Sequence, residues 1–279
     1  MYKRQILNVL MNLFFVAVLH MTVEGVATAT VLANVFSAII LLRRLMISPL
    51  DIRVEPKALR IHADCMGRIL RIGLPAGIQS AVFSVSNIVI QAGINSLGTV
   101  VMAASSAALN LELMAYFVLN SFSQACTTFV GQNYGAWKLD RCKKTLALSL
   151  LEDAIATAAV IALVLGAGKP VLAIFNNDPQ VISLGYTRLV LVFSAYMFSM
   201  MYEVMSGYLR GFGISLTPAA LTTLGVCGIR IFWIAVVFPR NPTFRTIMYV
   251  YPISLSTTAL LIFLALLWFR PAKRAAERE

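Results

Sequence analysis

The chain of 279 residues is 59% hydrophobic and only 13% charged, with a mean hydropathy of +0.81. Soluble domains are about 45–50% apolar and about 25% charged, so this composition excludes an ordinary soluble protein and indicates a membrane protein. The net charge of +11 comes from lysines and arginines that gather between apolar segments, which is typical of membrane topology rather than of nucleic-acid binding.

Eight apolar segments approach or exceed the length of about 20 residues that a bilayer-spanning helix needs. In chain order, we predict spanning helices at residues 6–19, 25–42, 69–96, 100–129, 144–167, 184–208, 215–238 and 247–269. The first of these is several residues short. The predicted fold class is therefore all-α, a polytopic transmembrane helix bundle of about eight spanning helices.

The basic residues are distributed unevenly between the two sets of loops that these helices define. The loop at 43–68, the turn at 138–144, Arg210 and the tail at 270–279 hold most of them, whereas the opposite loops hold only Lys169, Arg240 and Arg245. Loops rich in lysine and arginine stay in the cytoplasm. The pattern predicts a multi-pass protein of the plasma membrane, the inner membrane of a bacterial cell, with its C-terminus in the cytoplasm.

The sequence contains no motif for enzymatic, nucleotide or metal chemistry. There is no GxxxxGK[ST] loop, only two histidines occur, and the four cysteines lack CxxC spacing. We therefore expect free thiols and predict that the protein is not an enzyme and has no metal, no cofactor and no nucleic-acid partner. If it moves solutes, an ion gradient of H⁺ or Na⁺ must supply the energy.

A weak internal repeat links two apolar segments. Residues 8–18 (NVLMNLFFVAV) align with residues 226–236 (VCGIRIFWIAV), with identities at Phe14/Phe232, Ala17/Ala235 and Val18/Val236. The segments lie six helices apart in the predicted order. Duplicated halves are common in transporters, so the repeat indicates two six-helix halves, of which this chain holds the second and the end of the first.

Four stretches carry a resemblance to a known family. They are GLPAGIQSAVFSVSN at 73–87, FVGQNYGAWKLDRCKKT at 129–145, GYLRGFGIS at 207–215 and GVCGIRIFWIAVVFP at 225–239. In order and spacing the chain resembles the second lobe of multidrug and toxic compound extrusion (MATE) transporters. Two further stretches, NVLMNLFFV and GVATATVLANVFSAIILL, resemble the last two helices of the family's first lobe.

The resemblance implies a division of the chain. It makes residues 6–42 the last two helices of the first lobe, 43–68 a cytoplasmic linker between lobes, 69–269 a complete six-helix second lobe, and 270–279 a cytoplasmic tail. Family members have twelve helices, so we expect an N-terminally truncated chain. Residues 1–5 (MYKRQ) match one frame of a transposon-type sequencing adapter, and we expect them to be a non-native leader. A genuine, shortened N-terminus is the alternative.

Two acids inside predicted spans are the candidates for ion or proton coupling. A charge at the centre of a spanning helix costs about 2.5–3.5 kcal/mol on insertion scales, so Glu112 and Glu203 need a partner or water. A buried, hydrogen-bonded strut is the alternative for Glu112. Because Arg210 stands seven residues after Glu203, too far for an i, i+4 pair, we expect the two to have different partners. The resemblance implies acids at the positions of Ser199 and Phe83, which this chain lacks, so the coupling ion stays open.

Two other acids precede the middle of the fifth predicted span. We expect Glu152 and Asp153 to pair with Arg230, the only basic residue in the middle of a span, or to line the cytoplasmic mouth. Arg188 is expected near the outer end of its helix.

Polar residues recur on two predicted helices and indicate a substrate cavity. Gln79, Ser80, Ser84, Asn87 and Gln91 fall on one helical stripe through steps of three and four residues. Hydrogen bonding between helices is the competing explanation. The predicted cavity residues are Gln79, Ser84, Asn87, Gln91, Tyr116 and Asn120.

A second set of residues is predicted to shape helices and turns. Gly73 and Pro75 interrupt the third predicted helix, because proline frees a backbone carbonyl there, and the kink is either static or used in transport. Gly131 and Gly135 are expected to permit a tight turn at a helix exit. Arg210 is assigned to a cytoplasmic turn.

Three functions are compatible with the sequence. The first is secondary active multidrug efflux, the antiport of amphipathic or cationic organic compounds against H⁺ or Na⁺, by a monomer whose partners are the lipid bilayer and small organic substrates. The second is a lipid-linked oligosaccharide flippase of the same superfamily, which would need several arginines and lysines in its cavity. The third is an inactive fragment of an efflux transporter.

Overall fold

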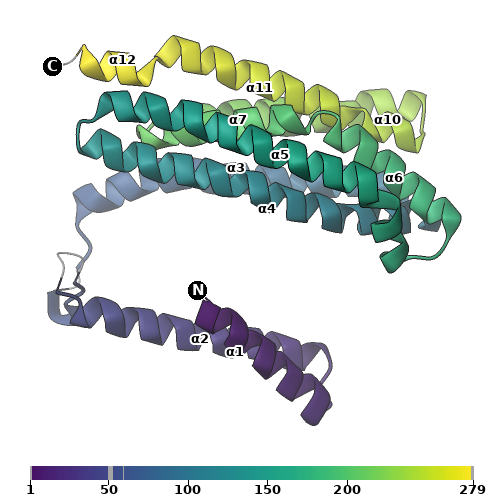
Figure 1. Cartoon of the computed structure of the whole chain (residues 1–279), viewed down its shortest axis with the longest axis horizontal. Coiled ribbons are helices and arrows are strands. Elements are labelled where there is room, and N and C mark those ends of the chain that lie inside the picture. Colours follow the sequence, from purple (N-terminus) through teal and green to yellow (C-terminus); the bar gives the residue numbers. More distant parts are fainter. Residues whose placement is uncertain (1, 50–52, 59, 278–279) are drawn as a thin grey trace. The chain divides into compact units, whose positions relative to one another are not determined.

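The computed structural model describes residues 2–49, 53–58 and 60–277 and contains two compact units, Met1–Met66 and Gly67–Glu279. Helices make up nearly all of the described residues, and no strand occurs among them (Figure 1). The all-α prediction is thus confirmed. The two units are described separately.

The first unit is a pair of packed helices. Helix α1 (Tyr2–Leu13) continues into a π-helical turn, η1 (Phe14–Val18), and the chain reverses at His20, whose φ is 52°, before α2 (Val23–Ile47). Gly25, Ala29 and Ala33 are the buried residues of α2. Their spacing of four places them on one face, where small side chains let a neighbouring helix approach closely. A 3₁₀ turn, η2 (Pro56–Ala58), follows α2.

The second unit begins with four long helical segments. They are α3 (Ala63–Asn95), which starts just before the unit boundary, α4 (Thr99–Gly135), α5 (Leu139–Phe175), and the pair α6 (Pro179–Phe193) and α7 (Tyr196–Gly211). Asp178 caps α6 by accepting a hydrogen bond from the Gln180 amide at 2.8 Å, and proline occupies the first turn, where its missing N–H costs nothing.

The remaining helices form two further hydrophobic segments. The first runs from α8 (Leu216–Thr222) through a π-helical turn, η3 (Thr223–Gly228), then α9 (Ile229–Phe232), a second π-helical turn, η4 (Trp233–Val237), and a 3₁₀ turn, η5 (Phe238–Arg240). The second comprises α10 (Phe244–Met248), α11 (Val250–Phe269) and α12 (Pro271–Ala276). Figure 1 shows α11 lying along α7.

Six helical segments among the described residues are each long and apolar enough to cross a membrane. They are Val23–Ile47, Ala63–Asn95, Thr99–Gly135, Leu139–Phe175, Leu216–Arg240 and Phe244–Ala276. Helices α6 and α7 make a seventh if the bent pair is counted as one span, and Arg4–Val18 is a shorter apolar helix. Leu148, Leu151 and Ile155 show how α5 presents apolar side chains outward, each being more than half exposed on one face, as expected where lipid is the solvent.

The structure adds detail to three predicted segments. The predicted helix at 184–208 is bent by 47° between α6 and α7. At the bend the Ser194 hydroxyl donates to the Leu191 carbonyl at 2.8 Å and the Ala195 amide bonds Val192, which tightens the turn and breaks the regular ladder. Helix α2 continues to Ile47 and α3 starts at Ala63, so the helices extend into the predicted linker 43–68. The predicted tail at 270–279 contains α12, which packs on α5.

The turn between α4 and α5 does not use its glycines as predicted. Gly131 lies inside α4 and Gly135 is its last residue, and neither has a positive φ. The left-handed residue of the turn is Trp137, with φ of 59°. Gly131 instead lies against the backbone of Gly211, where an added Cβ would make an ordinary contact at 3.6 Å with the Gly211 carbonyl oxygen.

Helices α4 and α7 cross at a contact made of small residues. A Cβ added at Gly207 would lie 2.6 Å from the Ser123 carbonyl oxygen, and one at Gly211 would lie 2.7 Å from the Val130 side chain. The Thr127 hydroxyl donates to the Gly207 carbonyl at 3.0 Å. Glycines four residues apart therefore allow the two backbones to meet and to bond across the interface. This contact positions α7, and Glu203 lies one turn before Gly207 on the same helix.

Candidate functional site

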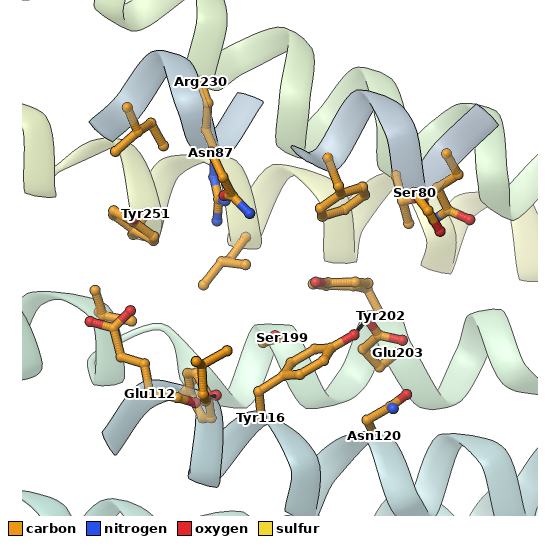
Figure 2. A pocket seen from close by; sticks show the side chains of 18 of the residues that line it. Ser80, Asn87, Glu112, Tyr116, Asn120, Ser199, Tyr202, Glu203, Arg230 and Tyr251 are labelled. Carbon is orange, nitrogen blue, oxygen red and sulfur yellow. Dashed lines mark hydrogen bonds between the residues drawn. The ribbon is translucent and has the colours of Figure 1, made fainter. Parts of the chain in front are cut away.

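A cavity of about 670 Å³ lies within the second unit. Side chains from α3 form one wall and those from α4 and α7 form the other (Figure 2), and residues of α6, α8, α9 and α11 complete the lining. Its charged lining residues are Glu112, Arg188, Glu203, Arg210 and Arg230. The cavity is thus lined by three arginines and two glutamates inside a bundle whose outer surface is apolar.

Glu112, on α4, is bound tightly by Arg188, on α6. The Arg188 Nε and Nη2 atoms donate to the two Glu112 carboxylate oxygens at 2.5 and 2.9 Å, and the Arg188 and Glu112 side chains are 3% and 9% exposed. The Tyr196 hydroxyl donates to the Glu112 carbonyl at 3.2 Å, and Arg188 also reaches the Tyr251 hydroxyl at 3.4 Å. Both carboxylate oxygens are therefore occupied, an arrangement that gives a strong and directional ion pair.

The prediction for Arg188 gives only a place near the outer end of its helix, and the structure adds its bonds to Glu112. Arg188 faces the cavity and lies in the core of the unit. No local spacing could have paired it with Glu112, since the two residues are 76 positions apart.

Glu203, on α7, has a looser set of partners. Its Oε1 accepts a hydrogen bond from the Tyr116 hydroxyl at 3.5 Å, and its Oε2 lies 3.9 Å from Arg210 Nη2. Arg210 also donates to the Ser123 hydroxyl at 3.2 Å, and that hydroxyl donates to the Glu203 carbonyl at 2.7 Å. Figure 2 shows the Tyr116 ring reaching across from α4 to the carboxylate.

The expectation that Glu203 and Arg210 have different partners is wrong. Seven residues are close to two full helical turns, so both side chains leave α7 on the same face. The axial separation of about 10.5 Å exceeds the reach of an i, i+4 pair but is within the combined reach of a glutamate and an extended arginine. Arg210 therefore faces the cavity in addition to ending the helix.

Arg230 lies in the cavity wall without Glu152 or Asp153 beside it. Its Nε donates to the Ser254 hydroxyl at 3.4 Å, and its guanidinium lies 4.6 Å from the centre of the Tyr251 ring. Asp153 is fully buried elsewhere and accepts a hydrogen bond from Thr157 at 3.1 Å, while Glu152 is exposed. The predicted pairing of these acids with Arg230 is wrong, because the cavity rather than α5 adjoins Arg230.

Most of the predicted cavity residues line this cavity. They are Gln79, Asn87, Gln91, Tyr116 and Asn120. Ser84 is not among the lining residues, and its hydroxyl bonds to the Ser80 carbonyl at 3.0 Å within α3. Ser80, one turn earlier, lines the cavity in its place. Gln79 also donates to the Thr222 hydroxyl of α8, so hydrogen bonding between helices accounts for part of the stripe.

The sequence reasoning missed the aromatic wall. Tyr196, Tyr202 and Tyr251 line the cavity, and each is less than one tenth exposed. The sequence signal that could have identified them is the occurrence of tyrosines inside apolar spans, because a buried tyrosine hydroxyl normally has a hydrogen-bond partner.

The predicted interruption of the third helix is not a break in α3. Pro75 lies inside a continuous helix, and Gly73 has open space around its Cα.

The cysteines contribute no cluster to the site. Cys65 is exposed, Cys126, Cys142 and Cys227 are buried, and all four are free. Among the described ranges, no three His, Cys, Asp or Glu side chains are grouped so that they could hold a metal ion.

Comparison with known proteins places these features in a family. Residues 75–236 match the family model described as MatE. The chain is 21% identical over 212 residues to the protein named "Probable multidrug resistance protein YoeA" of Bacillus subtilis, covering 75% of this chain and 46% of that protein. It is 20% identical to the multidrug export protein MepA of Staphylococcus haemolyticus, with 74% and 46% covered. The chain thus spans less than half the length of these curated relatives.

Solved structures show the same fold. A MATE protein crystallised in complex with MaL6 matches with a TM-score of 0.87 at 17% identity, over 98% of this chain and 62% of that one. An outward-facing multidrug resistance MATE family transporter of the MOP superfamily matches with a TM-score of 0.86, also at 17% identity, over 98% and 61%.

Proposed function

Because this chain belongs to the MatE family of transporters, we propose that it serves secondary active efflux, in which an amphipathic or cationic organic compound leaves the cell in exchange for H⁺ or Na⁺. Members of this family are transporters rather than enzymes. The proposed setting is the plasma membrane, with the C-terminus in the cytoplasm and the protein acting as a monomer. The lipid bilayer and small organic molecules are its proposed partners.

The observation that carries this proposal is the environment of Glu203. Its carboxylate lines a cavity of about 670 Å³, large enough for a drug-sized molecule, and its two contacts are long, at 3.5 and 3.9 Å. An ion pair of this length leaves coordination positions on the oxygens that a proton or Na⁺ can take. A carboxylate inside a membrane protein is costly and by default indicates a functional site.

Of the two predicted coupling acids, Glu203 is the better candidate. Glu112 already has both oxygens bonded to Arg188, so an incoming ion would have to displace a buried bidentate partner. Glu203 needs to give up only the 3.9 Å contact with Arg210. We propose that Glu203 binds the coupling ion and that Glu112 orients the cavity wall.

Coupling between ion binding and helix movement would depend on the contact between Glu203 and Arg210. Arg210 connects the Glu203 carboxylate to Ser123 on α4, at the close contact between α4 and α7. When an ion neutralises Glu203, the attraction between Glu203 and Arg210 is lost, and the contact of α7 with α4 changes. An ion that binds one arrangement of these helices better than the other shifts the balance between them.

The experiment compares gradient-driven transport in proteoliposomes by wild type and by Glu203→Gln, Glu203→Asp and Glu112→Gln. Glutamine keeps the shape of glutamate and removes its charge. The control is Glu152→Gln, because Glu152 is exposed and does not line the cavity. We expect Glu203→Gln to lose at least about tenfold in ethidium or norfloxacin transport driven by a proton or Na⁺ gradient, which corresponds to about 1.4 kcal/mol.

Glu203→Asp should keep part of the transport, and Glu152→Gln should match wild type. Running proton and Na⁺ gradients separately identifies the coupling ion. If Glu203→Gln transports like wild type under both gradients, Glu203 is not the coupling site. If wild type exports neither compound under either gradient, efflux by this chain is rejected.

A further inference from the structure

Arg230 is the cavity arginine that has no acidic partner. Arg188 is bound by Glu112, and Arg210 lies 3.9 Å from Glu203. No carboxylate of the described residues lies within 4.0 Å of the Arg230 guanidinium. The charged lining residues therefore leave one positive charge unbalanced, and it is located at Arg230.

The burial of Arg230 makes its unpaired positive charge unfavourable in free energy. The residue is only 7% exposed, and among the described residues the hydrogen bond of its guanidinium is the 3.4 Å bond from Nε to Ser254. A guanidinium has five N–H donors, so most of them have no acceptor in the part of the chain that the structure describes. Stacking on the Tyr251 ring at 4.6 Å offsets part of the cost, but a buried charge without a counter-charge remains unfavourable.

We infer that Arg230 binds the carboxylate of an amphipathic substrate, so that the cavity prefers zwitterionic compounds over purely cationic ones. This inference rests on the proposed efflux function and specifies its substrate class. A planar guanidinium with free N–H groups can bind a carboxylate through two parallel hydrogen bonds. The Asn87 amide also lines the cavity and supplies a further polar group to it.

The cavity then has two poles that match the two charges of a zwitterion. Figure 2 shows Arg230 and Tyr251 toward one side of the view and Glu203 with Tyr116 toward the other. The carboxylate of a substrate would meet Arg230, and its ammonium group would meet Glu203. The aromatic wall of Tyr196, Tyr202 and Tyr251 would contact the apolar part between them. The ammonium and the coupling ion would compete for Glu203, which is what an exchange of one for the other requires.

The first test needs no mutation. Norfloxacin carries a carboxylate and an ammonium group at neutral pH, and norfloxacin methyl ester keeps the ammonium and lacks the carboxylate. We expect purified wild type to bind norfloxacin at least about tenfold more tightly than the ester, measured by equilibrium titration of ligand fluorescence, because charge-assisted hydrogen bonds would be lost. Equal affinity for the acid and the ester would overturn the inference.

The second test uses Arg230→Met, Arg230→Lys and the matched control Arg240→Met, since Arg240 is exposed and lies outside the cavity. Arg230→Met should reduce norfloxacin affinity to that of the ester and leave ester and ethidium affinities unchanged. Arg230→Lys should keep part of the preference for the acid. Arg240→Met should bind as wild type does. An equal loss for acid and ester in Arg230→Met would mean that Arg230 only supports the fold.

These outcomes are separable from failure of the proposed function. Binding titrations do not depend on transport, so a preference for the acid in a protein that shows no gradient-driven efflux would reject the efflux proposal and keep the anion site. If Arg230→Met does not fold, equal affinity of wild type for acid and ester still overturns the inference, and Arg230→Lys then tests whether the site is at Arg230.

Discussion

Arg188 on α6 and Glu112 on α4 form a buried, two-bond ion pair, with N–O distances of 2.5 and 2.9 Å. Tyr251 on α11 accepts a third hydrogen bond from the same guanidinium at 3.4 Å. One arginine thus connects three helices at the end of the cavity. The pair differs from Glu203 and Arg210, whose nearest atoms are 3.9 Å apart, so the two glutamates of the cavity are held with unequal strength.

The first prediction concerns this pair and stability. Removing one partner leaves the other charge buried and unpaired, so Glu112→Leu or Arg188→Met should each cost about 3–5 kcal/mol of unfolding free energy. The double variant removes both charges and should recover most of that loss. Denaturant unfolding in detergent, followed by tryptophan fluorescence, measures all three. Additive losses in the double variant would show that the two side chains act independently.

The second prediction concerns the contact between α4 and α7. Gly207→Ala places a methyl group 2.6 Å from the Ser123 carbonyl oxygen, so the helices must separate, at a cost of about 1–3 kcal/mol. The matched control is Gly166→Ala, because Gly166 is helical and has open space around its Cα. That variant should be as stable as wild type or up to about 1 kcal/mol more stable. Thermal unfolding in detergent measures both, and equal melting temperatures for the two variants would contradict the contact.

The features that sequence could predict are those set by local spacing. The stripe on α3 follows from steps of three and four residues, and four of its members line the cavity or its rim: Gln79, Ser80, Asn87 and Gln91. The spans follow from apolar runs alone. Ser84 lies less than a quarter turn around the axis of α3 from Ser80 and Gln91, which line the cavity. The sequence pattern cannot locate the edge of the cavity-facing surface that closely, because each residue advances only about 100° around the helix.

The features that sequence could not predict depend on contacts between distant segments. Glu112 was identified as a candidate, but its partner is 76 residues away and only the packing of α6 on α4 brings them together. The bend between α6 and α7 comes from Ser194, a residue that is compatible with a continuous helix. The absence of a counter-charge near Arg230 likewise depends on which helices adjoin it.

The third prediction concerns Asp153. Its side chain is fully buried on α5, its Oδ1 accepts a bond from Thr157, and its Oδ2 has no partner among the described residues. Asn at this position keeps the acceptor for Thr157 and removes a charge that has no cation within 4.0 Å among the described residues. Asp153→Asn should therefore unfold at the same or a higher denaturant concentration, with a gain of up to about 2 kcal/mol. A clear loss of stability would show that the carboxylate is paired in the membrane-embedded protein.

The fourth prediction concerns topology, which the distribution of basic residues predicts. Cys65 is the exposed cysteine, and Cys126, Cys142 and Cys227 are buried, so a membrane-impermeant maleimide should label Cys65 alone in the folded protein. With loops rich in arginine and lysine in the cytoplasm, Cys65 should react in inverted membrane vesicles and stay unlabelled in intact cells.

The matched probe for the opposite side is Asn241→Cys in a Cys65→Ser background. Asn241 is exposed at the turn between η5 and α10, on the predicted outer side. It should react in intact cells at least about tenfold faster than Cys65 does, since lipid keeps the charged reagent from the inner surface. Labelling of Cys65 from outside, with Asn241→Cys protected, would reverse the orientation and place the C-terminus outside the cytoplasm.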